Sequence, residues 1–166
     1  MITVIKADIT TLQVDAIVNA ANAALRGGGG VDGAIHRAAG PELLNELLRF
    51  PSCPTGEAVI TRGYRLPAKY VIHAVGPVWR DGRAREAKRL ESAYESSFAR
   101  AREHRDIRTI AFPAISTGVY HFPKAEAARI ACMVMRRHEN EFDEIIACLF
   151  DDESVRLYEE NLNRAT

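Results

Sequence analysis

The sequence predicts an α/β domain in which helices cover both faces of a largely parallel β-sheet. Short apolar runs recur along the chain without strict alternation, as expected for strands that are buried on both faces. Between several of these runs lie segments with apolar residues at helical spacing. The chain has 166 residues, the size of one domain, so we expect a single domain over residues 1–166.

The expected elements follow one another in a strand and helix alternation. Strands are predicted at residues 2–5, 16–18, 58–60, 70–75, 109–112 and 145–150. Helical spacing occurs around residues 35–39, 43–48, 90–101, 128–135 and 155–162. Gly40 and Pro41 separate the first two helices, because glycine suits the closing position of a helix and proline suits the first turn.

Composition excludes several classes of function. Lys and Arg number 22, as do Asp and Glu, so no net field favours a polyanion or a membrane surface. General nucleic-acid binding and membrane attachment are therefore not expected, although the balance leaves a local patch open. Three widely spaced cysteines form neither a disulfide framework nor a metal-ligand pattern, and the N-terminus begins as a strand, not as a signal peptide. We expect a cytoplasmic protein.

A basic run lies between residues 80 and 108, and it is interrupted by Glu86, Glu91, Glu95 and Glu103. Its members are Arg80, Arg83, Arg85, Lys88, Arg89, Arg100, Arg102, Arg105 and Arg108. Mixed charge of this kind is typical of a solvated helix face.

Polar and glycine-rich segments follow several strands, at the ends where open α/β sheets bind ligands. Asn19, Asn22 and glycines 27–30 follow the second strand, with Asp32 opening the next helix. Small and hydroxyl residues 113–120 follow the fifth strand. The two loops offer enough backbone donors to hold a diphosphate between them.

Residues 28–33 formally match the G-x-G-x-x-G fingerprint of nicotinamide-binding folds. The preceding strand ends about ten residues too early, and no second strand with an acidic ribose ligand follows. Nor does Gly-Lys-Ser/Thr, the mark of a triphosphate loop, occur anywhere. A diphosphate bound by another route is favoured, and a nicotinamide-dependent oxidoreductase is kept as an alternative.

Asp32 and Asn22 have two interpretations each. Asp32 is a candidate N-cap, and a carboxylate at a helix N-terminus is also able to orient a water or a sugar hydroxyl. Asn22 is either a turn residue or, with Asn19 and the glycines nearby, a ligand for vicinal hydroxyls.

Other candidates are equally divided between structural and binding roles. Phe150 is either a core residue or a platform for a base, and Asp8 either a turn residue or an acceptor for an exocyclic amine. Tyr120 is expected at the rim. His36 and His73 are interpreted as structural.

Together these segments resemble the macrodomain family, and within it the bacterial MacroD-type ADP-ribose hydrolases. The resemblance runs from Ile5 to about Asn161 and is carried by residues 7–10, 18–22, 27–36, 53–58, 72–77 and 114–120. It implies a three-layer α/β/α macrodomain fold with a central mixed, largely parallel sheet and an ADP-ribose cleft at its rim.

The resemblance also assigns the cleft. Asp8 would bind the adenine amino group with Ile9 nearby, and Phe150 would stack on the base. Asn22 and Asp32 would meet the distal ribose and carry the chemistry, with Tyr120 closing over it. The diphosphate would lie between two groups of residues, Gly29, Gly30 and Val31 on one side and Ser116, Thr117, Gly118 and Val119 on the other.

Members of this branch deacetylate O-acetyl-ADP-ribose and remove mono-ADP-ribose from Asp or Glu side chains of modified proteins, without a metal or cofactor. A non-catalytic module that only binds ADP-ribose is the alternative. The sequence leaves open whether Asp32 is a general base or orients water. Two residues depart from the usual family pattern, Ala7 and His121, which stand where glycine is common.

Overall fold

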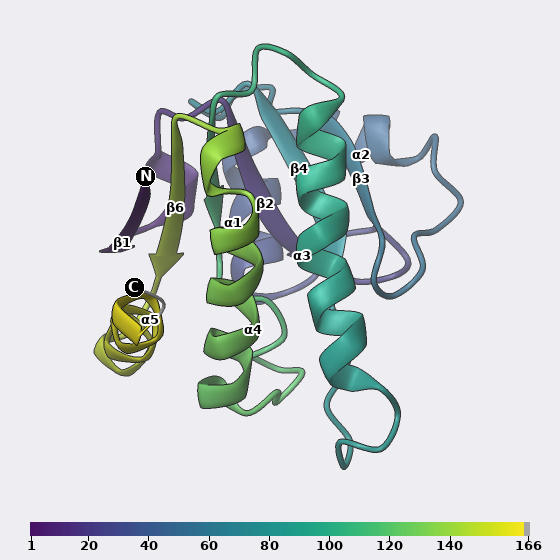
Figure 1. Cartoon of the computed structure of the whole chain (residues 1–166). Helices are drawn as coiled ribbons and strands as arrows, with labels where there is room; N and C mark the ends of the chain where they lie inside the picture. The colour runs from purple at the N-terminus through teal and green to yellow at the C-terminus, as the bar shows by residue number, and fades with distance from the viewer. Residues whose placement is uncertain (165–166) are drawn as a thin grey trace.

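The computed structural model describes residues 1–164 as three layers, with a six-stranded sheet between two layers of helices (Figure 1). The order across the sheet is β1-β6-β5-β2-β4-β3, and every neighbouring pair is parallel except β3 with β4. The expected mixed, largely parallel sheet is therefore confirmed. Its strands are β1 (Ile2–Lys6), β2 (Ala16–Ala21), β3 (Ala58–Arg62), β4 (Tyr70–Val75), β5 (Thr109–Phe112) and β6 (Glu144–Leu149).

Helices cover both faces of the sheet, as the apolar spacing predicts. One face packs against α1 (Gly30–Ala39) and α2 (Pro41–Leu47). The other packs against α3 (Glu86–Arg102), α4 (Lys124–Arg137) and α5 (Asp152–Arg164). Two short 3-10 turns, η1 (Ile9–Thr11) and η2 (Glu139–Glu141), complete the elements. None of these helices is long and apolar enough to span a membrane.

Two buried clusters, one on each face, form the core. The larger contains an aromatic group in which the Phe98 and Phe112 ring centroids lie 4.9 Å apart and those of Tyr94 and Phe112 5.4 Å apart. The smaller cluster is mainly aliphatic, with Ile35 of α1 and Leu43 of α2 fully buried on it. Burial on both faces explains why the strands are continuous apolar runs.

The junction between α1 and α2 is confirmed. Gly40 closes α1 with a φ of 87°, in the left-handed region that favours glycine, and Pro41 occupies the first turn of α2.

Two expected boundaries are wrong. Strand β2 continues past Val18 to Ala21, because Asn19 satisfies its side chain inside the protein and does not end the strand. Helix α1 begins at Gly30, before Asp32, and its N-cap is Gly29 without any side-chain cap. Asp32 therefore lies in the first turn and is not the N-cap.

Candidate functional site

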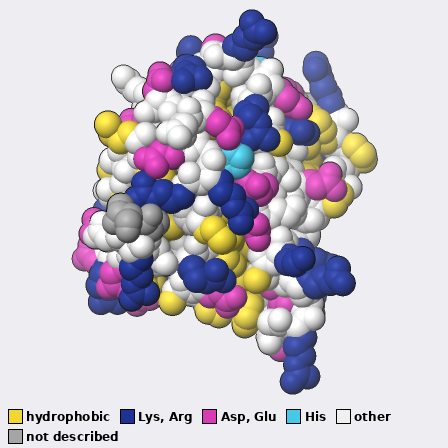
Figure 2. All heavy atoms as spheres, viewed as in Figure 1, with side chains coloured by type: hydrophobic (Ala, Val, Ile, Leu, Met, Phe, Trp, Pro, Cys, Tyr) yellow, Lys and Arg dark blue, Asp and Glu magenta, His cyan; other side chains and the backbone are white. Residues whose placement is uncertain are grey.

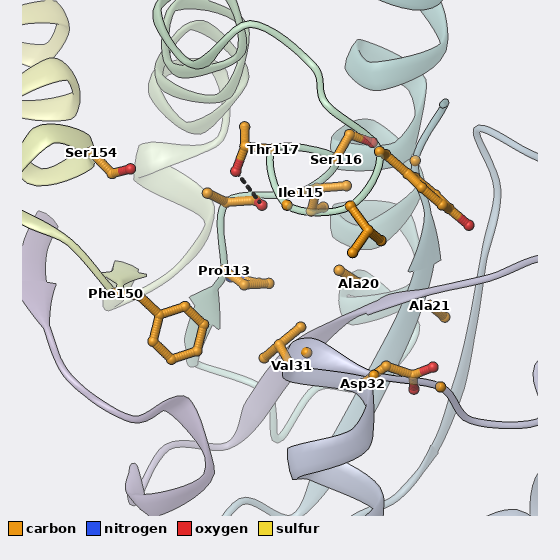
Figure 3. A pocket seen from close by; sticks show the side chains of 18 of the residues that line it. Ala20, Ala21, Val31, Asp32, Pro113, Ile115, Ser116, Thr117, Phe150 and Ser154 are labelled. Carbon is orange, nitrogen blue, oxygen red and sulfur yellow. Dashed lines mark hydrogen bonds between the residues drawn. The ribbon is translucent and has the colours of Figure 1, made fainter. Parts of the chain in front are cut away.

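A cavity of about 480 Å³ lies at the carboxyl edge of the sheet, where the loops after β2, β4, β5 and β6 meet. Figure 3 shows Phe150 at one end of it and Asp32 at the other, with Val31 and Pro113 between them. Every binding residue expected from the sequence lines this cavity except Asp8 and Ile9. The two loops that are far apart in the sequence are thus brought together as predicted.

Asp8 and Ile9 lie outside the cavity lining. The Asp8 carboxylate accepts hydrogen bonds from the Thr10 backbone N–H, at 3.0 Å, and from the Thr10 hydroxyl, at 2.7 Å, and so caps η1. Ile9 is buried in the core of the α1 face. The structure shows the turn role for Asp8, and its contact with an adenine stays a prediction.

Asp32 is hydrogen-bonded to a central strand of the sheet, β2. Its side chain is largely buried, with the residue 5% exposed, and Oδ1 accepts a 2.8 Å hydrogen bond from Asn19 Nδ2 on β2. His36 Nε2, one turn further along α1, lies 3.4 Å from the same oxygen. The positive end of the α1 dipole adds to the stabilisation of the carboxylate charge. Asp32 is thus fixed at the end of the cavity.

A chain of buried hydrogen bonds continues behind Asn19. The second N–H of Asn19 Nδ2 donates to His73 Nδ1 at 3.1 Å, so His73 must carry its proton on Nε2. That proton points to the Thr61 hydroxyl, 2.9 Å away, which itself donates to the Arg62 carbonyl. Both amide hydrogens of Asn19 are thus used, on Asp32 and on His73, while its Oδ1 has no hydrogen-bond partner among the described residues.

His73 is neutral in this chain. Burial and, to a smaller extent, the nearby His36 lower its pKa to about 3, although Asp32 acts in the opposite direction. The structural role predicted for His73 is confirmed, and the sequence interpretation missed its connection to Asp32. The side chains of Asn19 and His73 point to the same face of the sheet, because the two residues are register partners in β2 and β4.

Asn22 has the turn role, and its contact with a ligand stays a prediction. Its Nδ2 donates to the Gly27 carbonyl at 2.9 Å, and its Oδ1 accepts from the Leu25 N–H at 3.0 Å. These bonds hold a loop in which Leu25 and Gly27 have positive φ angles. Asn22 also lines the cavity, and one amide hydrogen remains for a ligand.

The glycines between Asn22 and Asp32 keep the cavity open. A Cβ on Gly28 would lie 3.2 Å from Asp32 Oδ2 and 3.5 Å from Asn22 Nδ2, so the two side chains converge on its backbone. A Cβ on Gly29 or Gly30 would meet nothing within 4 Å. The backbone at the start of α1 is therefore not crowded by other side chains, and the first N–H groups of a helix favour an anion.

The opposite wall is formed by the loop after β5, which is held close to Gly76 at the end of β4. A Cβ on Gly76 would lie 2.2 Å from Ser116 Oγ and 2.5 Å from Ile115 Cγ2. Ser116 has a φ of 69°, and its buried hydroxyl has no partner within residues 1–164. Only glycine at position 76 permits this approach. The sequence analysis did not assign this role to Gly76.

Phe150 and Val119 are exposed apolar side chains at the cavity. Phe150 follows the last residue of β6 and is 62% exposed, so it is not a core residue. Val119 is more exposed still. Large apolar groups in water at the rim of a cavity are typical of ligand contacts.

The two departures from the family pattern have different structural consequences. Ala7 has no positive φ, so alanine is accommodated there. His121 has a φ of 60°, a conformation in which glycine is less strained.

The fingerprint-like glycines do not form a nicotinamide-binding turn. Residues 22–29 separate β2 from α1, and the next strand, β3, pairs antiparallel with β4 at the sheet edge. A dinucleotide fingerprint requires a tight turn within a parallel β-α-β unit. Across residues 1–164, no three His, Cys, Asp or Glu side chains are arranged to hold a metal ion.

Comparison with known proteins agrees with this architecture. A family model described as "Macro domain" matches residues 18–131, which is more than half of the chain. The chain belongs to the macro domain family.

Three relatives show how similar other members are. A macro domain-containing protein of Ralstonia nicotianae is 58% identical over 97% of this chain and 94% of its own length. A protein of Salmonella gallinarum named O-acetyl-ADP-ribose deacetylase is 54% identical over 93% of this chain and 90% of its own length. The Xenopus laevis protein named ADP-ribose glycohydrolase MACROD2 is 51% identical over 95% of this macrodomain chain and 39% of its own length.

A solved structure gives the same fold. A variant of the Oceanobacillus iheyensis macrodomain, solved with ADPR, superimposes with a TM-score of 0.89 and 39% sequence identity. The match covers 98% of this chain and 91% of the other. The three-layer macrodomain architecture predicted from the sequence is confirmed.

The close approach at Gly76 predicts a steric effect. Replacement of Gly76 by Ala should lower the free energy of unfolding by about 1–3 kcal/mol, because the new methyl group overlaps Ser116 and Ile115. Urea denaturation followed by circular dichroism measures this change. Gly118→Ala is the control, because a Cβ there meets nothing within 4 Å, and equal effects of the two substitutions would contradict the packing.

The buried His73 predicts a pH dependence of stability. Its pKa in the folded protein is about 3, below the ordinary value of 6.5. Between these two pH values the unfolded chain therefore binds a proton at His73 that the folded chain does not. Stability should therefore fall as the pH decreases from about 6.5 toward 3, by up to about 1.4 kcal/mol per pH unit. Denaturation of wild type and His73→Gln across this range measures the difference. Identical slopes would show that His73 does not cause it.

Proposed function

We propose that this macrodomain hydrolyses ADP-ribose esters. The reactions are deacetylation of O-acetyl-ADP-ribose and removal of mono-ADP-ribose from acidic side chains. The observation that carries the proposal is the placement of Asp32, whose carboxylate is buried at the cavity end, fixed by Asn19 and close to Asn22. A carboxylate fixed beside an amide is able to orient a water as well as a sugar hydroxyl, which favours a hydrolase.

ADP-ribose fits the chemistry of the cavity from one end to the other. Phe150 offers an aromatic face for the base. The α1 N-terminus and the loop after β5 offer backbone donors for the diphosphate, with the unpartnered Ser116 hydroxyl beside them. Asn22 and Asp32 remain for the distal ribose. The macrodomain of Oceanobacillus iheyensis solved with ADPR has the same fold, which supports this ligand.

Asp32 and Asn22 have different roles at the distal ribose. Asp32 orients a water molecule toward the ester, while the free amide hydrogen and carbonyl lone pair of Asn22 position the sugar hydroxyls. Since Oδ1 of Asp32 is taken by Asn19, the second oxygen is the one available to the water. One carboxylate is sufficient here, because neither reaction releases a poor alkoxide from an acetal carbon as glycoside hydrolysis does. In de-ADP-ribosylation the bond from the ribose to the Asp or Glu side chain breaks and a stable carboxylate leaves. In deacetylation water adds to the acetyl carbonyl carbon, and acetate and the sugar hydroxyl are the products. The names of the Salmonella gallinarum and Xenopus laevis relatives support these two reactions.

Chromatographic detection of ADP-ribose release tests the proposal. Wild type should release ADP-ribose from O-acetyl-ADP-ribose and from an ADP-ribosylated glutamyl peptide. Asp32→Ala and Asn22→Ala should lower kcat by about 100-fold or more, because each removes a group that orients the reactants. Asp143→Ala, a substitution of an exposed carboxylate that pairs with Arg108, serves as the matched control.

Calorimetric titration with ADP-ribose separates the alternatives. Tight binding without release by wild type would favour the non-catalytic module. Binding of a reduced nicotinamide cofactor in place of ADP-ribose would favour the oxidoreductase. Loss of both release and binding in Asp32→Ala would show that Asp32 contributes to ADP-ribose affinity and not to the chemical step.

A further inference from the structure

A group of unpaired cations lies on the segment that follows β4 and on the first turn of α3. We call it the distal basic patch, and its members are Arg80, Arg83, Arg85, Lys88 and Arg89. All five residues are exposed, and none forms an ion pair within residues 1–164. Figure 2 shows Lys and Arg side chains gathered at the lower right, below and over the start of α3. Toward the other end of α3, Arg100 and Arg102 are paired with Glu103 and Glu141.

Glu86, the first of the four glutamates that interrupt the basic run, points inward. Glu86 is 1% exposed, and its Oε2 accepts from the N–H groups of Arg80 and Gly82, both at 3.0 Å. Its Oε1 accepts from the Ala84 N–H at 2.7 Å. These backbone bonds lower the pKa of Glu86 to about 2. The carboxylate is thus occupied by the backbone and leaves the five cations without a side-chain partner, and Asp81 is the exposed acid among residues 80–89.

The same segment is anchored to the wall of the cavity. The Trp79 N–H donates to the Tyr120 carbonyl at 2.8 Å, and the Trp79 and Phe122 ring centroids lie 4.9 Å apart. Gly82 has a φ of 80°, and a Cβ on it would lie 2.9 Å from the Trp79 ring. The patch therefore has a defined position relative to Tyr120, which lines the cavity.

The sheet order places the patch at the distal ribose end. The loop after β6 carries Phe150, the loop after β2 carries Asn22, and the segment after β4 carries the patch. Since β2 lies between β5 and β4, the patch is on the side of the cavity that is opposite to Phe150. A group attached to the distal ribose would leave the cavity on this side.

We propose that the distal basic patch binds an acidic peptide segment that carries the ADP-ribosylated Asp or Glu. The inference rests on the proposed function. Four of the five cations are arginines, whose planar guanidinium groups match carboxylates with two parallel hydrogen bonds. Acidic segments supply both the modified side chain and the flanking carboxylates that these groups recognise.

The observations favour a peptide over a nucleic acid. The patch spans ten residues of a chain with zero formal net charge, whereas a nucleic-acid site needs a longer basic track. The aromatic residue of the segment, Trp79, is half-buried and has its ring against Phe122, so it is not a free platform for a base. A short acidic segment needs only the local field.

The test compares a patch variant with a matched control. The patch variant is Arg80→Gln, Arg83→Gln and Lys88→Gln together. Arg85 is left unchanged because it caps α3 with a φ of 60°. The control is Arg49→Gln, Arg62→Gln and Arg105→Gln, which removes three exposed cations that also lack ion pairs in the described part of the chain. Substrates are O-acetyl-ADP-ribose, an ADP-ribosylated glutamyl peptide with acidic flanks, the same peptide with neutral flanks, and single-stranded DNA with an ADP-ribosylated terminal phosphate.

The patch variant should lose roughly 10-fold or more in kcat/KM on the acidic peptide, while O-acetyl-ADP-ribose turnover stays within about twofold of wild type. The loss should shrink at high salt and with neutral flanks. The control triple variant should behave as wild type. Equal turnover of the acidic peptide by patch variant and wild type would overturn the proposal and leave the proposed function intact. A loss confined to the DNA substrate would overturn it in favour of a nucleic acid.

Binding gives a readout that does not depend on turnover. Fluorescence anisotropy measures the affinity for the labelled ADP-ribosylated acidic peptide in the Asp32→Asn variant, with and without the patch substitutions. The patch substitutions should weaken this affinity, as they lower kcat/KM. Unchanged affinity would overturn the proposal even if no substrate is hydrolysed. Failure of wild type on O-acetyl-ADP-ribose with patch-dependent binding intact would instead count against the proposed function alone.

Discussion

The hydrogen bond between Asn19 and Asp32 is the interaction on which the candidate site depends. A carboxylate that is almost fully buried is costly unless hydrogen bonds compensate for the lost water. The 2.8 Å bond from Asn19 supplies one, and it ties the first turn of α1 to the centre of the sheet. The glycine loop joins these two elements, β2 and α1. Its path is therefore determined at both ends.

Much of the fold follows from patterns that operate over short distances. Continuous apolar runs identified the strands, and the glycine and proline pair identified the division between α1 and α2, because both signals are local. The boundary of β2 was not predictable in the same way. An asparagine at the end of an apolar run usually marks a turn, and only the presence of Asp32 and His73 across the face makes Asn19 a strand residue.

The site was predictable where residue type alone limits the role and not where the role depends on distant neighbours. The two loops were identified from their glycines and hydroxyls. Gly76 was missed because its reason for being glycine is the approach of Ser116, forty residues away in sequence. Glu86 was misinterpreted for a similar reason, since alternating charges predict a solvated side chain, and only the folded loop shows its carboxylate turned to the backbone.

The buried hydrogen bonds from Asp32 to Thr61 have fixed donors and acceptors: Asn19 donates to Asp32 and to His73, and His73 donates to Thr61. Asn19 cannot become aspartate without facing Asp32 with a second acceptor, and His73 cannot become a residue that lacks an acceptor without leaving an Asn19 hydrogen unpaired. A change at one of these positions is tolerated only with a matching change at the next. Positions 19, 61 and 73 are therefore expected to evolve as a unit, although they lie on three different strands.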